Sequence, residues 1–300
     1  WAYESTGIRE LQDSGLDGSG IHVCMVDTGI DDSHPDFANL TLTGFRDFYE
    51  DEHDLVRDVG EDSHGTMMAG LLVADGKFRG AAPGVDLSVA LALGPSGTSG
   101  QEDRVAQAIR WCRITQKADI VSLSLGSEPG DGMGIQSETT LAVQEALDAG
   151  IFVVAAAGNT GDDPDIFDVS VPANLPGVIA VGSSTRSGSV WSNSAGGSLT
   201  NPYGDGNRSY PDQKPEVTAP GVLLFSTTTT LIEPPYAYST GTSDSTVLVT
   251  GALALILELH GAALAGDDGV IDSDEMGIVK RALASSCDKT GIDGSPHDTR

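Results

Sequence analysis

The segment Val23-Cys24-Met25-Val26-Asp27-Thr28-Gly29 is an apolar run that ends in a carboxylate and a turn. Its apolar residues follow one another without alternating with polar ones, which is typical of a strand buried on both faces of a sheet. Such strands occur in parallel sheets that helices cover on both sides. The segment therefore predicts a central strand of an α/β fold, with Asp27 at its carboxyl end.

Other segments repeat this pattern. Strand-length apolar runs occupy residues 21–26, 87–91, 120–125, 151–156 and 178–181. Between two of them Val105, Ala108, Ile109 and Cys112 recur at i, i+3, i+4 and i+7, the spacing of one apolar helix face. We therefore expect a doubly wound α/β fold, a mostly parallel β-sheet flanked by helices. With 300 residues and 39% hydrophobic content, we expect one domain over residues 1–300.

The composition is strongly acidic, with 16 basic against 44 acidic residues and a net charge of −28. Such a chain repels nucleic acid and anionic membranes, so we expect neither as a partner. Salt screens self-repulsion, since the screening length falls from about 10 Å at 0.1 M to about 3 Å at 1 M. We therefore interpret the charge as the acidic surface of a halophilic protein; an acidic surface without salt adaptation is the alternative.

Two features bear on compartment. The apolar stretch 247–259 is interrupted by Thr250, Gly251 and Glu258, so no membrane span is expected. Three cysteines cannot all pair within one chain, and each lies in or beside an apolar run. We interpret them as small buried hydrophobic residues rather than a disulfide framework: Cys24, Cys112 and Cys287.

Four polar residues stand where hydrolytic chemistry would need them. A Ser nucleophile requires a His base, a carboxylate that orients the His, and donors for the oxyanion. Asp27 ends a strand, and His64 precedes a small-residue segment able to start a helix. Asn159 follows the run 151–157, and Ser243 stands at a predicted helix start, where its N–H has no intrahelical acceptor.

Each residue also has an ordinary interpretation. Asp27 can be a strand-end cap and His64 a solvated loop histidine. Asn159 can be a turn residue that tolerates left-handed geometry, and Ser243 a plain helix cap. The four together, in the order Asp, His, Asn, Ser, favour catalysis.

The segments around these residues resemble the signature motifs of the subtilase family. Those around the four residues are Val26-Asp27-Thr28-Gly29-Ile30 with His34-Pro35-Asp36, His64-Gly65-Thr66, Ala157-Gly158-Asn159 and Gly241-Thr242-Ser243, and supporting ones are Ser122-Leu123-Ser124-Leu125-Gly126 and Val178-Ile179-Ala180-Val181-Gly182. The resemblance extends from about residue 15 to about residue 291. It implies a subtilisin-like three-layer α/β/α fold and serine endopeptidase activity on polypeptides.

The resemblance also implies roles for residues. Asp27, His64 and Ser243 would form the triad, with Asn159 as oxyanion donor. Substrate would bind as an added strand. One wall of the cleft would be Ser124, Leu125 and Gly126, Gly97 would mark the facing edge, and Ala156, Ala157 and Gly158 would line the specificity pocket.

One departure from the family concerns the residue after the nucleophile. Where the family continues with Met-Ala-x-Pro-His, this chain has Asp244-Ser245-Thr246-Val247-Leu248. A carboxylate beside Ser243 would disfavour an anionic intermediate. Two rival interpretations are a silenced, peptide-binding subtilase-like domain and a protease of narrow specificity that acts in maturation or regulation.

The resemblance implies no cofactor for catalysis and allows a structural Ca²⁺ ion, whose ligands the sequence does not identify. The segment 267–275 is similar to the later half of an EF-hand loop but lacks the first carboxylate ligands, so a capped helix start is favoured. A cleaved pro-segment before Trp1 and secretion are the family's usual pattern, and we expect both, with an intracellular location as the alternative.

Overall fold

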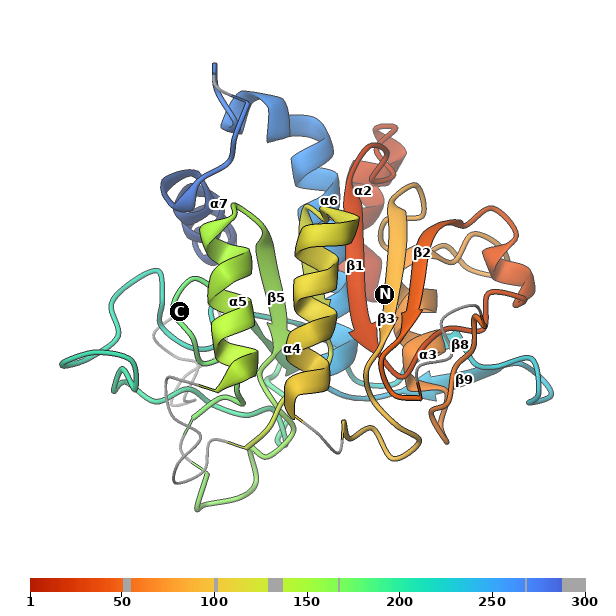
Figure 1. Cartoon of the computed structure of the whole chain (residues 1–300), viewed down its shortest axis with the longest axis horizontal. Coiled ribbons are helices and arrows are strands. Elements are labelled where there is room, and N and C mark those ends of the chain that lie inside the picture. Colours follow the sequence, from red (N-terminus) through yellow and green to blue (C-terminus); the bar gives the residue numbers. More distant parts are fainter. Residues whose placement is uncertain (51–54, 100–101, 129–136, 167, 268, 288–300) are drawn as a thin grey trace.

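A computed structural model of the chain describes residues 1–50, 55–99, 102–128, 137–166, 168–267 and 269–287 (Figure 1). Its centre is a seven-stranded sheet in the order β2-β3-β1-β4-β5-β6-β7, whose neighbouring strands all pair in parallel. The strands are β1 (His22–Asp27), β2 (Thr41–Asp47), β3 (Asp86–Leu91), β4 (Ile120–Leu123), β5 (Phe152–Ala156), β6 (Ile179–Ser184) and β7 (Val217–Pro220). The predicted doubly wound α/β fold is confirmed.

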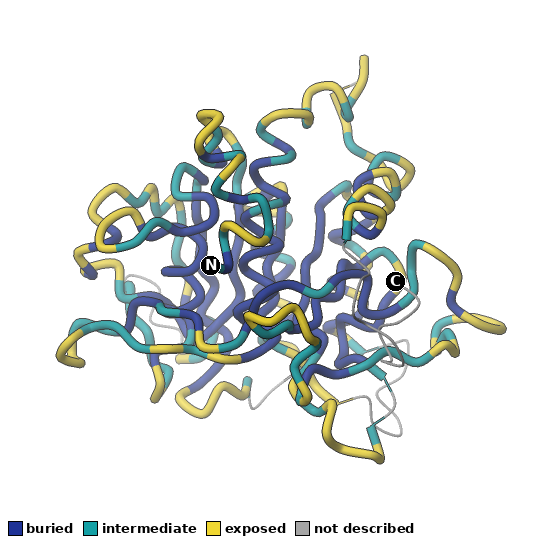
Figure 2. The backbone as a smooth tube through the Cα atoms, turned by 180° about the vertical axis from the view of Figure 1, so that it is seen from behind, coloured by how far each residue is buried: buried dark blue, intermediate teal, exposed yellow. Residues whose placement is uncertain are grey.

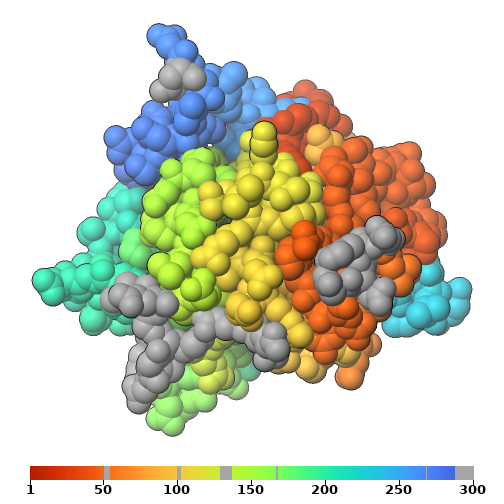
Figure 3. All heavy atoms as spheres, viewed as in Figure 1, coloured from red at the N-terminus to blue at the C-terminus, as the bar shows by residue number. Residues whose placement is uncertain are grey.

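Helices cover both faces of this sheet. The helices α4 and α5 pack side by side on the face seen in Figure 1, and their atoms cover it in Figure 3. On the other face α6 runs along β4 to β7 and packs against α3. The helices are α1 (Ala2–Ser5), α2 (Ile8–Asp13), α3 (His64–Val73), α4 (Glu102–Trp111), α5 (Glu138–Asp148), α6 (Thr242–Leu264) and α7 (Ser273–Ser286), with a 3-10 turn (Pro35–Phe37) and a π-helical turn (Cys112–Gln116).

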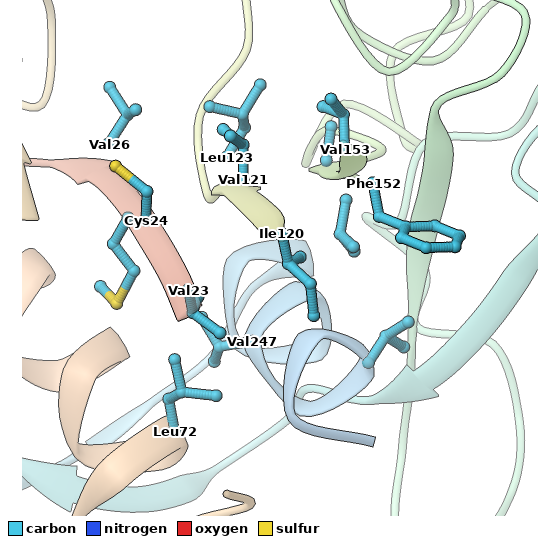
Figure 4. Close-up of a cluster of buried hydrophobic side chains, with 14 of the residues drawn as sticks. Val23, Cys24, Val26, Leu72, Ile120, Val121, Leu123, Phe152, Val153 and Val247 are labelled. Carbon is cyan, nitrogen blue, oxygen red and sulfur yellow. The ribbon is translucent and has the colours of Figure 1, made fainter. Parts of the chain in front are cut away.

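The buried interior consists of strand side chains packed against the two helices behind the sheet. In Figure 4 Val247 of α6 and Leu72 of α3 lie near Val23 of β1 and Ile120 of β4. All four are fully buried. Viewed from behind, the buried residues fill the middle of the molecule and exposed residues gather in the outer loops (Figure 2).

Helix α6 has 23 residues and a mean hydropathy of 1.9, so by length and composition it could cross a membrane. Half of that apolar window is buried inside the protein, against the sheet and α3. Its place in the interior gives a sufficient reason for its apolar sequence, since a helix that is apolar all round is the usual core helix of a protein of this size.

The interpretation of all three cysteines as unpaired is wrong. Cys24 of β1 and Cys112, which directly follows α4, form a disulfide with a Cα–Cα distance of 5.7 Å. Both are fully buried, so their burial was correctly expected but their pairing was not. They are 88 positions apart in sequence, and only the packing of α4 on β1 brings them together. Cys287, which lies outside the disulfide, is half-buried.

A buried ion cluster joins α7 to the sheet. Just before β7, Glu216 Oε1 lies 2.9 Å from Nζ of Lys214 and 2.8 Å from Nζ of Lys280, which belongs to α7. Lys280 also pairs with Asp212. Burial lowers the pKa of Lys214 to about 7, against the opposing charge of Glu216, and Lys280 lowers it further. The α7 helix begins at Ser273 and is capped by Asp272, which forms a capping box with Glu275, so the predicted capped helix start is confirmed.

Candidate active site

The predicted site residues gather at the carboxyl ends of the strands. Asp27 is the last residue of β1, Ser124 directly follows β4, and Asn159 comes three residues after β5. The chain builds the sheet outward in opposite directions from β1, which has β3 on one side and β4 on the other. Ligand sites of open α/β sheets lie at such switch points.

Asp27 and His64 are in direct contact. His64 is the first residue of α3, and its Nδ1 lies 2.7 Å from Oδ1 of Asp27. The carboxylate is 1% exposed and also accepts the N–H of Thr28 at 2.7 Å. The contact fixes the imidazole with Nδ1 toward Asp27, so that Nε2 is left for a second partner.

Loop contacts hold the start of α3 against the end of β1. Asp58 accepts the Thr28 hydroxyl at 2.7 Å, and its other oxygen accepts the N–H and the hydroxyl of Thr66. Gly65 lies so close to Gly29 that a Cβ at position 65 would be 2.1 Å from the Gly29 carbonyl oxygen. Any side chain at 65 would therefore push α3, and His64 with it, away from Asp27.

Ser243 is the second residue of α6. Its Oγ donates to the carbonyl oxygen of Ser124 at 3.1 Å, and the Ser124 hydroxyl donates to the Ser243 carbonyl at 3.2 Å. The pair of bonds joins the end of β4 to the first turn of α6. In this resting arrangement the Ser243 hydroxyl is turned to Ser124, while His64 lines the same cleft.

Asn159 is anchored through one side of its amide. Oδ1 accepts both the backbone N–H and the hydroxyl of Thr242, each at 2.9 Å. The Thr242 oxygen in turn accepts the N–H of Gly158 at 3.1 Å. With its oxygen occupied in this way, the amide keeps Nδ2 as a donor next to the residue that precedes Ser243.

A cleft of about 700 Å³ runs across these residues. Its walls include all but one of the predicted substrate-binding residues, together with His64, Asn159 and Ser243. Those in the lining are Gly97, Ser124, Leu125, Gly126, Ala156 and Gly158. Ala157 is outside the lining; it is fully buried and hydrogen-bonded to the backbone of Val181 and Ser170.

Other lining residues escaped the sequence analysis. Three are carboxylates, Glu61, Asp62 and Glu128, and the lining of the cleft contains no Lys or Arg among the described residues. Glu61 and Asp62 precede His64 by three and two positions, so their place beside the site could have been predicted from the sequence. Ser170 also lines the cleft, in an irregular segment between β5 and β6 that no periodic pattern marks.

Electrostatics at His64 favour the protonated ring. Burial lowers its pKa, but the charge and hydrogen bond of Asp27 and the charges of Asp62 and Asp244 outweigh burial and raise it to about 9. The imidazolium is the species formed when His64 accepts a proton. The surroundings of His64 therefore stabilise the state that general-base catalysis produces.

Structural calcium is the one metal that the family resemblance allowed. Within the described ranges, no three or more His, Cys, Asp and Glu side chains are grouped so that they could hold a metal ion. The described side chains thus do not fit a carboxylate-built calcium site.

Comparison with known proteins gives one family. The model of the subtilase family, peptidase S8, matches residues 18–297. The major intracellular serine protease of Bacillus subtilis strain 168 is 36% identical over 256 residues, which cover 82% of this chain and 71% of that protein. Subtilisin E of the same organism is 34% identical over 253 residues, 83% of this chain, and the match spans only 58% of its length.

A solved structure agrees with these sequence matches. The crystal structure of a cold-adapted subtilisin-like serine proteinase superposes with a TM-score of 0.67 at 25% identity, covering 89% of this chain and 83% of that one. The parallel sheet between helix layers is common to both, as the sequence resemblance implied. From the family match over most of its length, the chain belongs to the subtilase family of serine endopeptidases.

Proposed function

We propose that the chain cleaves peptide bonds through an acyl-enzyme in which Ser243 is the nucleophile, His64 the general base and Asp27 the group that orients His64. The observation that carries the proposal is the 2.7 Å contact between His64 Nδ1 and Asp27 Oδ1, in a cleft that Ser243 also lines. An imidazole fixed through Nδ1 has Nε2 available for the proton of the nucleophile.

The first step needs one side-chain rotation. On this proposal Ser243 Oγ turns from the Ser124 carbonyl, to which it donates in the resting arrangement, toward Nε2 of His64. Loose nucleophile–base geometry is common before substrate binds. Oγ then attacks the peptide carbonyl carbon while its proton passes to Nε2. The same proton leaves with the amine when the peptide C–N bond breaks, and a water molecule repeats the sequence to release the acid.

The negative oxygen of the intermediate needs donors. Asn159 Nδ2 and the backbone N–H of Ser243 are the two we propose, because the first belongs to an amide held by Thr242 and the second lies in the first turn of α6. The positive end of the helix dipole acts in the same direction.

The test is labelling with a fluorophosphonate in 1 M salt, with Ser243→Ala as control. The proposal expects one label per chain, none in the control, and loss of labelling in His64→Ala. A folded protein that takes up no label would support the rival interpretation, a peptide-binding domain without activity. Cleavage of a random peptide library at many sites rather than one would separate general digestion from narrow processing.

Several further properties belong to this proposal. We expect residues 1–300 to act as one peptidase domain on polypeptide substrates, without nucleic acid or membrane partners, after removal of a pro-segment. The buried disulfide supports export from the cell, because disulfides persist in oxidising compartments. Thiol titration of the protein taken from its source checks this, since a reduced Cys24 and Cys112 would favour an intracellular location.

Salt adaptation is proposed on the net charge of −28. The acidic surface of a halophilic protein repels itself less as salt rises. The temperature of half-unfolding should therefore increase between 0.1 M and 1 M NaCl, and an unchanged value would remove the halophilic interpretation. Adding Ca²⁺ or EDTA in the same measurement tests the structural ion, for which the described side chains offer no cluster.

A further inference from the structure

Asp244 is a buried carboxyl next to the nucleophile. It follows Ser243 in the first turn of α6 and is only 1% exposed. Its Oδ2 accepts the hydroxyl of Ser239 at 3.0 Å, whereas Oδ1 has no hydrogen-bond partner within the described part of the chain. A buried carboxylate oxygen without a partner is destabilising, so its presence beside a catalytic serine calls for a physical reason.

The charged and titratable groups around this carboxyl come from two other helices. His64 at the start of α3 interacts with it favourably, and each stabilises the charged form of the other. Tyr3 of α1 is the second group, and it stays neutral because burial raises its pKa. Burial raises the pKa of Asp244 to about 7, against the Ser239 hydrogen bond and the charge of His64, so the carboxyl ionises near neutral pH.

Gly241 separates Asp244 from the oxyanion donor. A Cβ at position 241 would be 3.4 Å from Nδ2 of Asn159 and 3.5 Å from Oδ2 of Asp244. The carboxyl and the donor thus flank the same glycine at the entry to α6. Asp244 is not part of the cleft lining, so its ionisation would place a negative charge beside Ser243 and not in the lining of the cleft.

We propose that Asp244 is a positioning residue for catalysis, whose buried carboxylate acts on the imidazolium of His64 from α6 while Asp27 holds it from β1. The inference rests on the proposed function, since it assigns the carboxyl to the proton-accepting step. Three carboxylates act on His64: Asp27 of β1, Asp62 of the loop before α3, and Asp244 of α6. The side-chain hydrogen bond of Asp244 goes to Ser239 and not to the imidazole, so on this proposal Asp244 works through its charge.

Asp62 offers a matched comparison because it acts on the same ring but is exposed. Salt screens exposed charges within a few ångströms at 1 M, whereas a buried pair is screened much less. Asp62→Asn and Asp244→Asn each remove one carboxylate charge without changing the size of the side chain. Only the effect of the buried one should survive in high salt.

The experiment measures the titration midpoint of His64 by NMR of its ring Cε1–H, in 0.1 M and 1 M NaCl. Asp244→Asn is expected to lower the midpoint by about 0.5 pH unit at both salt concentrations, because the variant loses the attraction between the buried carboxylate and the imidazolium of His64. Asp62→Asn should lower it in 0.1 M and leave it almost unchanged in 1 M. The acid limb of kcat/KM should move in parallel in each case.

A His64 midpoint that is the same in Asp244→Asn as in the unaltered protein would overturn the proposal. Should that variant fail to fold, Asp244→Ser replaces it. The serine side chain is smaller and neutral, so the charge is again removed and the His64 midpoint should fall in the same direction. An unmoved midpoint in Asp244→Ser would then count against the proposal.

The proposed function and the role of Asp244 can be disproved separately. Absence of fluorophosphonate labelling in the unaltered protein removes the proposed function, but the NMR midpoint still reports whether Asp244 acts on His64. Normal labelling together with an unmoved midpoint leaves the function standing and removes the role of Asp244.

Discussion

Thr242 holds Asn159 by two hydrogen bonds to a single oxygen, one from its N–H and one from its hydroxyl. The two bonds to Oδ1 therefore fix the amide plane of Asn159, and with it the direction in which Nδ2 points. Because Thr242 immediately precedes Ser243, the proposed nucleophile and the proposed oxyanion donor are positioned by one turn of backbone.

Asn159→Ala should lower kcat with little change in KM, because the donor acts on the oxyanion and not on the bound peptide. Loss of the equivalent donor in subtilisin costs about 10²–10³ in kcat, and we expect a loss of that size. Thr242→Val, which removes one of the two anchoring bonds but keeps Nδ2, should have a smaller effect. Steady-state kinetics on one peptide substrate measures both, and an unaltered kcat in Asn159→Ala would exclude it from the mechanism.

The pH profile should reflect the raised pKa of His64. Only the neutral ring can accept the Ser243 proton, so kcat/KM should increase as pH rises through about 9, well above the range of an ordinary histidine. Asp27→Asn should move this limb to lower pH and reduce kcat by about 10⁴, because the ring loses its charge partner and its tautomer. A wild-type limb near pH 6.5 would contradict the electrostatics described for the site.

Peptides with Lys or Arg near the scissile bond should be cleaved faster than neutral ones. Glu61, Asp62 and Glu128 line the cleft and are exposed, and its described lining has no basic side chain. Exposed ion pairs contribute at most about 1 kcal/mol each, so we expect on the order of a tenfold preference in kcat/KM for a Lys over a Gln peptide.

The control for this preference uses carboxylates elsewhere. Glu61→Gln with Asp62→Asn should reduce the ratio of the two peptides toward one. Glu10→Gln with Asp13→Asn, on α2 and outside the cleft, removes the same formal charge and should leave the ratio unchanged. Equal effects of both pairs would mean that the overall charge, and not the cleft, selects the peptide.

The disulfide should contribute substantially to stability. In the chain-entropy model, cross-linking residues 88 positions apart raises the free energy of the unfolded chain by about 4.6 kcal/mol. Replacing Cys24 and Cys112 together by Ala should therefore lower the free energy of unfolding in denaturant. Cys287→Ala, outside the disulfide, is the comparison, and it should change that free energy far less.

The sequence predicted the middle of the sheet well and its borders poorly. The central strands β1, β3, β4, β5 and β6 are continuous apolar runs because both their faces are buried. At one edge β2 has exposed residues along its length, and at the other β7 has only two aliphatic residues and ends in Pro220, so neither is a continuous apolar run. The antiparallel hairpin of β8 (Leu224–Thr227) and β9 (Tyr236–Ser239) was not expected either.

The site could be predicted where motifs were local and not where it depended on packing. The four principal residues came from short motifs, and the structure puts Asp27 against His64 and lines one cleft with His64, Asn159 and Ser243. The burial of Asp244 could not be read from a helix start, where acidic residues are usually solvated. Nor could the bond between Cys24 and Cys112, because spacing along the chain says little about which cysteines meet.

The last described helix, α7, supplies a positive charge to a buried ion cluster, because Lys280 pairs with Glu216. Glu216 is 1% exposed, and two lysines neutralise it, one of them delivered by α7. A chain shortened before Ser273 would leave that glutamate with Lys214 alone. Burial already lowers the pKa of Lys214, so its positive charge is less stable than that of an exposed lysine. Cleavage before α7 by another molecule of the same protease would thus remove the Lys280–Glu216 ion pair and destabilise the fold, although Lys280 does not line the active-site cleft.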